Sequence, residues 1–149
     1  MANLVTTITE SVVLNGALRG SSNTVTTAGI NDVMERILVC TAAQETTIAV
    51  FASSPYASAG ALNVNDVRYI RVTNLDKAND IQLAVTTSTT NFEILISSGN
   101  SYVMSVSLLS VKGASGVPAF VAGGTLTSLI VKPTHATEPA SVELFVGLV

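Results

Sequence analysis

The stretch from Val67 to Val106 constrains the fold more than any other part of this chain of 149 residues. It holds four short segments in which every second residue is a large apolar one. Side chains of a β-strand alternate between two faces, so this spacing predicts four strands, each burying one face. Turn-forming residues separate the segments, and we expect an antiparallel meander. The alternating residues are Ile70 and Val72, then Ile81, Leu83 and Val85, then Phe92, Ile94 and Ile96, then Tyr102, Met104 and Val106.

Strand character continues before this stretch. Leu4 to Leu14 is β-branched on both faces, which predicts a long strand, and Asn15-Gly16 ends it. The polar residues from Arg19 to Thr27 predict a second, more exposed strand. The segment opened by Asn31-Asp32 fits a strand, although Met34, Ile37 and Leu38 also have helical spacing.

Further strand patterns lie on both sides of the stretch from Val67 to Val106, one before it and four after it. We expect strands at Thr46 to Phe51, Leu108 to Lys112, Pro118 to Ala122, Thr125 to Lys132 and Ser141 to Val149. About ten strands with frequent turns indicate an all-β chain, an antiparallel, jelly-roll-like β-sandwich with little or no helix. No linker divides the chain, so residues 1–149 are predicted to form a single domain.

Composition limits the partners of such a domain. Apolar residues make up 48% of the chain and charged residues only 11%, which is too little charge to cover a monomer in the usual way. The net charge is -3 and the seven Lys and Arg residues are spread singly, so no nucleic-acid partner is expected. The N-terminus lacks the basic start and apolar run of a signal peptide.

Three uncharged windows, Thr46 to Asn65, Ile94 to Val111 and Gly113 to Val131, are long enough to suggest membrane spans. Proline, glycine and hydroxyl residues interrupt them, so strands with small-residue turns are the better interpretation. We expect no membrane partner.

Few residues offer chemistry. His135 is the single histidine, and the sequence Gly113-Ala114-Ser115-Gly116 does not have the spacing of a nucleophile elbow. With one histidine and one cysteine, Cys40, the chain cannot assemble an ordinary zinc site, and Cys40 fits a buried structural thiol. We therefore expect no catalytic residues, no metal and no cofactor, and a protein that is not an enzyme.

Two groups of oxygen-bearing side chains are candidate sites. Oxygen ligands for Ca²⁺ gather at Asp66, Asn74, Asp76, Asn79 and Asp80, but their spacing matches no EF-hand and these residue types are common in turns. Any two of Glu10, Glu35, Glu93 and Glu143 might flank a glycosidic bond, although the chain has no tryptophan to stack on a sugar. Arg68 and Arg71 point to opposite faces of their strand and fit charges at its rim.

Three segments resemble a known family. VRYIRVTNLDKANDIQLAV, FEILISSGNSYVM and the closing PASVELFVGLV are similar to the β-sandwich core of small virion structural proteins of tailed bacteriophages, particularly head decoration or cement proteins. The resemblance covers about the second half of the chain and carries no functional residue. It implies a subunit on the outer surface of the capsid that binds the major capsid protein and bridges capsid subunits. A tail or fibre module that binds a receptor or glycan through the loops Ser53 to Asp66 and Pro133 to Pro139 is the alternative.

The same low charge favours an oligomer. Open strands without lysine are templates for aggregation, so we expect copies of the chain to cover one another, with a trimer favoured. The C-terminal strand is apolar and is expected to pair in a sheet of its own subunit or of a neighbour. Its residues Leu144, Val146, Leu148 and Val149 are the predicted interface.

Overall fold

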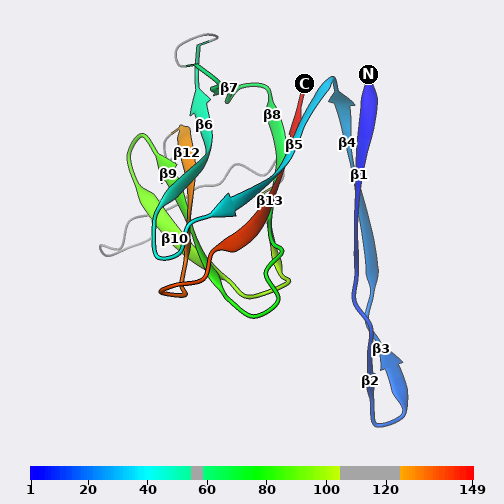
Figure 1. Ribbon diagram of the computed structural model, residues 1–149. Coiled ribbons are helices and arrows are strands. Elements are labelled where there is room, and N and C mark those ends of the chain that lie inside the picture. Colours follow the sequence, from blue (N-terminus) through cyan, green and yellow to red (C-terminus); the bar gives the residue numbers. More distant parts are fainter. Residues whose placement is uncertain (55–58, 105–124) are drawn as a thin grey trace, which may run out of the picture.

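The computed structural model describes residues 1–54, 59–104 and 125–149. Within these ranges the chain is all β, with thirteen strands and no helix, which confirms the predicted fold class at that level. Nine strands form a body of two facing sheets, and the first four form a long hairpin that leaves it (Figure 1). The predicted strands at Leu108 to Lys112 and Pro118 to Ala122 lie outside the described residues.

Each sheet of the body has a defined strand order. The four-stranded sheet runs β11 (Ser101–Met104), β8 (Val67–Asn74), β13 (Ala140–Leu148), β5 (Asp32–Cys40). The five-stranded sheet runs β10 (Asn91–Ile96), β9 (Ile81–Thr87), β12 (Leu126–Pro133), β6 (Thr46–Ala52), β7 (Leu62–Asn63). All pairs are antiparallel except β6 with β7. The segment opened by Asn31-Asp32 is strand β5, because it pairs with β13 along its whole length.

The pairing of the body strands is nested along the sequence. β5 pairs with β13, β6 with β12, β8 with β11, and β9 with β10. Successive pairs alternate between the two sheets, as if one long antiparallel hairpin had been rolled up.

The core lies between the two sheets and is almost entirely aliphatic. Each strand contributes the residues of one face, in agreement with the predicted alternation of side chains. Because both sheets supply the core, neither of them buries its apolar face without the other. The largest fully buried apolar side chains are Ile48, Val72, Ile81, Leu83, Val85, Leu129, Val131, Val142, Leu144 and Val146.

The predicted meander is wrong in its connections. The four segments are strands, but β9 and β10 form a hairpin in the five-stranded sheet, whereas β8 and β11 pair with each other in the four-stranded sheet. Two loops, 75–80 and 97–100, cross between the sheets and are joined by hydrogen bonds: Asn74 donates its backbone N–H to the Asn100 carbonyl (2.9 Å), and Gly99 donates to the Asn74 and Asp76 carbonyls (3.1 Å each). These bonds between the loops replace the ladder that a meander would have formed.

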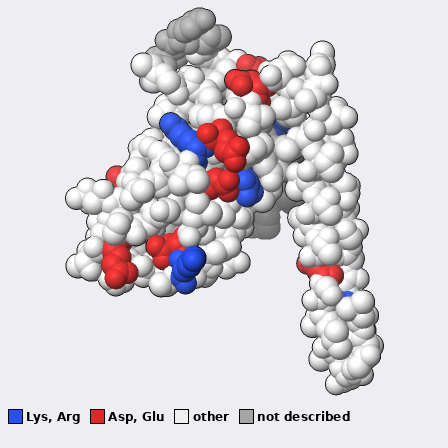
Figure 2. Space-filling view, turned by 45° about the vertical axis from the view of Figure 1, so that its right-hand side comes forward, with Lys and Arg blue, Asp and Glu red and all other residues white. Residues whose placement is uncertain are grey.

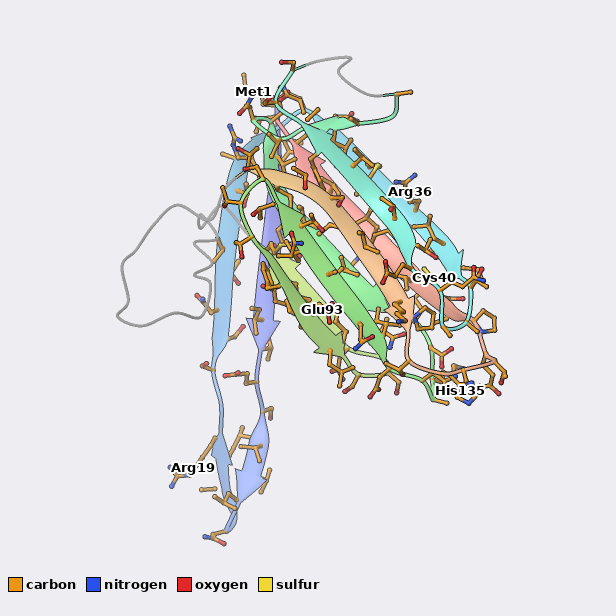
Figure 3. The ribbon with its side chains drawn as sticks, turned by 90° about the vertical axis from the view of Figure 1, so that its left-hand side faces the viewer. Met1, Arg19, Arg36, Cys40, Glu93 and His135 are labelled. Atoms are coloured by element: carbon orange, nitrogen blue, oxygen red, sulfur yellow. The ribbon has the colours of Figure 1, made fainter. Side chains whose placement is uncertain are left out.

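The hairpin consists of β1 (Ala2–Thr9) paired with β4 (Ser22–Ile30), and of β2 (Val12–Leu14) paired with β3 (Ala17–Arg19) at the far end. We call residues 2–30 the arm. It starts beside the C-terminus at one end of the body and runs past the body's opposite end (Figure 1). Seen from the side, the arm and the body diverge from this shared end (Figure 3).

Candidate interaction surface

The two faces of the arm differ in chemistry. Opposed residues in an antiparallel ladder share a face, so the pairs Thr7 with Thr24 and Thr9 with Ser22 lie on the same side. Their hydroxyls are hydrogen-bonded, at 3.0 Å and 3.1 Å. These hydroxyls bind one another, and the same face, which we call the hydroxyl face, also carries the exposed side chains of Val13 and Leu18 near the tip.

The opposite face, which we call the apolar face of the arm, carries most of the aliphatic side chains from the root to the tip, with Thr6, Glu10, Arg19 and Asn23 between them. Near the body Leu4 is half-buried, whereas Ile8 (58% exposed), Val12 (56%) and Leu14 (57%) lie open beyond it. Glu10 and Arg19 are the charged residues of the arm, and most of its surface is uncharged (Figure 2). An exposed aliphatic stripe of this kind is typical of a surface that binds another protein. The stripe comprises Leu4, Ile8, Val12, Leu14, Ala17 and Val25.

Local backbone geometry forms the tip of the arm. Asn15 (φ 50°) and Gly16 (φ 76°) take the left-handed conformation that a two-residue hairpin turn requires, and the strand ends there as the sequence predicts. Gly20 has a φ of 144°, and a Cβ placed on it would lie 2.0 Å from the Glu10 carbonyl oxygen. Only glycine fits at that close approach of the two strands.

The root of the arm is packed on the outer face of the four-stranded sheet. Gly147 of β13 leaves room there, because a Cβ placed on it would lie 3.4 Å from Cδ1 of Ile30 and 3.7 Å from Cδ2 of Leu4. Ile30 is 5% exposed, and Asn31 donates its backbone N–H to the Leu148 carbonyl at 2.9 Å. The arm is therefore anchored at its base.

A second exposed apolar surface lies on the same outer face. The outward side chains of β5 are Val33, Glu35, Ile37 and Val39, which we call the β5 row; Ile37 is 65% and Val39 68% exposed. On the neighbouring strands the outward groups bind one another, because Arg71 forms an ion pair with Glu143 (3.0 Å) and lies over the ring of Phe145. The β5 row has no such cover from described residues.

The residues predicted as the interface lie elsewhere. Leu144 and Val146 are 0% exposed and Leu148 is 7% exposed, all inside the core of their own subunit. Strand β13 has β8 on one side and β5 on the other, so neither of its edges is open. Val149 is half-buried and donates its N–H to the Asp66 carbonyl (2.9 Å). The sequence allowed β13 to pair in a sheet of its own subunit or of a neighbour. In the structure it pairs in its own subunit.

The residues weighed for catalysis are dispersed. His135 accepts the backbone N–H groups of Thr137 (3.3 Å) and Glu138 (3.0 Å) at Nδ1, which closes its loop. Glu10 lies on the arm, Glu93 on the five-stranded sheet, and Glu143 is paired with Arg71. Arg68 donates to the Asn65 and Val67 carbonyls (2.7 and 3.0 Å). The sequence Gly113-Ala114-Ser115-Gly116 lies outside the described residues.

The oxygen-bearing residues that could have bound Ca²⁺ form hydrogen bonds within and between the loops. Asp76 accepts the N–H groups of Ala78 and Asn79 (2.8 Å each), and these bonds lower the pKa of its carboxyl. Asp80 accepts the N–H of Ser98 at 3.1 Å, and Asp66 accepts from the Asn63 amide at 2.7 Å. In the described parts of the chain, no three acidic, histidine or cysteine side chains are grouped as metal ligands.

Two further titratable groups are shifted by burial. Burial raises the pKa of the Cys40 thiol, which a hydrogen bond with Thr46 only partly offsets, and it raises the pKa of Tyr102. A raised thiol pKa lowers the thiolate fraction at neutral pH, so Cys40 has the properties of a structural thiol.

A shallow groove lies on the outer face of the five-stranded sheet. Its lining is mixed, with two carboxylates and one ammonium group beside the apolar side chains of Ala84 and Ile130, and the described residues that line it include no aromatic ring. The residues include Glu45, Gln82, Thr86, Asn91, Glu93 and Lys132.

Comparisons with protein-family models, with curated proteins and with solved structures each found no match to this chain. The described residues include no helix of the length and apolarity needed to span a bilayer.

Proposed function

We propose that this protein is a structural component of a bacteriophage virion, a decoration or cement protein on the outer capsid surface. It binds the major capsid protein, bridges capsid subunits and assembles as a homo-oligomer, with a trimer favoured. The observation that carries the proposal is the arm, which presents exposed Ile8, Val12, Leu14 and Leu18 at a distance from the body. Such a projecting apolar ribbon serves contact with other proteins and has no role in binding a small substrate.

The body supports the same proposal. We infer that it is a jelly roll, because eight strands pair in nested fashion and alternate between two sheets. Jelly rolls occur in viral capsid proteins and in unrelated proteins. The fold is therefore compatible with a role in the virion, and the arm is the observation that favours it. The surface also fits, since a protein outside the shell does not meet packaged DNA and needs no basic patch.

Labelling of virions tests the proposal directly. An antibody against the purified protein is added to intact virions of the source phage, and the particles are imaged by electron microscopy. We expect label on the heads, and we expect heads stripped of the protein to break at a lower temperature than heads to which it has been added back. Virions that carry no label would contradict any virion role.

A tail or fibre module that binds a receptor or glycan is the second candidate. The groove bounded by Gln82, Glu93 and Lys132 favours it, because such side chains form hydrogen bonds with sugar hydroxyls. Label at the tail, together with glycan binding that Glu93→Ala abolishes, would favour this candidate over the first.

A further inference from the structure

Two surfaces of the chain are exposed and rich in aliphatic side chains. One is the apolar face of the arm beyond its root, with Ile8 and Val12 more than half exposed. The other is the β5 row, in which Ile37 and Val39 are about two-thirds exposed. Large exposed aliphatic rows of this kind are typical of binding surfaces, and no other described residue covers either of the two.

These surfaces do not meet within one subunit. The arm strands pair only with one another in the described sheets, and the arm diverges from the body beyond its root (Figures 1 and 3). Arg19, near the far end of the arm, lies well away from Arg36 on β5 (Figure 3). Contact between the two surfaces therefore requires two copies of the chain.

A contact already present in each subunit shows that the two surfaces are compatible. At the root, Leu4 of the apolar face lies over Gly147 on the outer face of the four-stranded sheet. Gly147 is paired with Val33, the first residue of the β5 row. The arm thus begins on the same sheet face that, further along, remains uncovered.

Charge also matches. Arg19 shares its face of the arm with Val12, and Glu35 lies within the β5 row. Neither side chain forms an ion pair or hydrogen bond with a described residue, whereas Arg71 and Glu143 beside the β5 row are paired with each other. Arg19 can therefore meet Glu35 across the contact, with Glu10 the other charged side chain on this face of the arm.

The geometry favours packing on the face of β5 over pairing with its edge. Arg36 of the edge strand β5 is exposed and donates its guanidinium to the Ile48 carbonyl of β6, which ties β5 to the other sheet. A charged side chain on an edge strand is a device that blocks the addition of a further strand. The outward row has no comparable obstruction.

We propose that the apolar face of the arm of one copy packs on the β5 row of a second copy, with Arg19 of the first opposite Glu35 of the second. The contact is heterologous, since different surfaces meet, and repeated contacts of this type form a closed ring when the rotation from one copy to the next closes, as the proposed trimer requires. The inference rests on the homo-oligomer of the proposed function, but it does not depend on attachment to a capsid.

Two variants at exposed positions test it by sedimentation equilibrium of the full chain. Ile8→Glu on the arm and Ile37→Glu on the β5 row each place a charge in the contact, and each is expected to weaken self-association by about tenfold or more. Thr9→Glu, on the hydroxyl face of the arm, is the matched control and should associate as the unmodified protein does. Circular dichroism verifies that every variant keeps its strands.

Mixing the two variants is the decisive measurement. A copy with Ile8→Glu retains its β5 row, and a copy with Ile37→Glu retains its arm, so a mixture forms a dimer through one intact contact although neither variant does so alone. Charge reversal gives a second test: Arg19→Glu and Glu35→Arg each weaken association, and the double variant restores it.

Three results would overturn the inference: a monomeric unmodified protein, self-association unchanged by Ile37→Glu, or variant mixtures that remain monomeric. The labelling of virions tests attachment to the capsid independently of all three results. If the arm variants stay assembled but no longer bind capsids, the arm binds the shell, and the cement role survives without the contact between copies. If mixing restores the dimer but virions carry no label, the contact stands and the cement role fails.

Discussion

Asn74 carries a full set of hydrogen bonds at the edge of an otherwise aliphatic core. Its side chain is 0% exposed, donates to the Asn79 carbonyl (2.9 Å) and the Ile96 carbonyl (3.1 Å), and accepts the N–H of Asp76 (3.0 Å). It therefore joins the loop that leaves β8 to the end of β10 in the opposite sheet. This residue holds together the crossing that distinguishes the fold from a meander.

Replacing Asn74 by alanine should destabilise the protein by about 2–4 kcal/mol. The change leaves buried backbone groups without partners and opens a small cavity. Urea unfolding monitored by circular dichroism measures the loss. Asn100→Ala, at an exposed side chain of the neighbouring loop, should change stability by less than about 0.5 kcal/mol. Equal effects of the two changes would contradict the role given to Asn74.

Asp76 should contribute to stability only above acid pH. The N–H groups of Ala78 and Asn79 lower the pKa of its carboxyl in the folded state, so the unfolded chain binds a proton at higher pH than the folded one. The contribution is therefore present above the ordinary pKa of about 4 and is lost as the pH falls through the lower pKa of the folded state. Asp76→Asn removes the titration. Unfolding followed between pH 6 and pH 2 should show a shallower loss for the variant, and identical slopes would exclude this contribution.

At the scale of elements, the strands followed from the sequence and their partners did not. The alternation of Ile81, Leu83 and Val85 fixes which side of β9 is buried, and all three are buried. Alternation does not say which sheet a strand joins, because both sheets bury the same kind of residue against the same core. The assignment of β9 to the sheet opposite β8 depends on contacts made by the loop residues Asn74 and Gly99, and those have no periodic signal.

The arm was also only half predictable. Leu4 to Leu14 was expected as a long strand that ends at Asn15-Gly16, and the chain turns there. Both faces of this segment mix apolar and polar residues, so the sequence does not indicate which face is buried. The interface was expected at Leu144, Val146 and Leu148 and not on the arm. The apolar pattern of these three residues is equally consistent with a core strand, and they lie in the core.

Gly147 should control how firmly the arm is anchored. An added Cβ would be in ordinary contact with Ile30, Tyr69 and Leu4, so Gly147→Ala is expected to be tolerated. The larger side chain of Gly147→Val has no space under the root and should displace Leu4 and Ile30. Hydrogen exchange should then become faster in the amides of β1 and β4 while those of β9 and β12 keep their protection. Arm amides that exchange equally in both variants would mean that the root is not held at Gly147.

For the whole molecule, the arm links stability to assembly. A two-stranded ribbon is marginally stable alone in water, and this one leaves Ile8, Val12 and Leu14 of its apolar face exposed. If a second copy covers these residues, association stabilises the folded chain by mass action. Raising the concentration to one hundred times the dissociation constant adds about 2.7 kcal/mol.

The melting temperature should therefore rise with protein concentration. A stabilisation of about 2.7 kcal/mol raises the melting temperature of a chain of this size by about 5–10 °C. Calorimetry over a hundredfold range of concentration measures the rise in the unmodified protein. Ile8→Glu should show a clearly smaller rise, because the variant associates more weakly, and its melting temperature at low concentration should be unchanged because Ile8 is exposed in the single subunit. Thr9→Glu, on the hydroxyl face, should retain the rise. A melting temperature independent of concentration in the unmodified protein would show that the arm is not covered by a second copy, and the apolar face would then be left for a partner of a different kind.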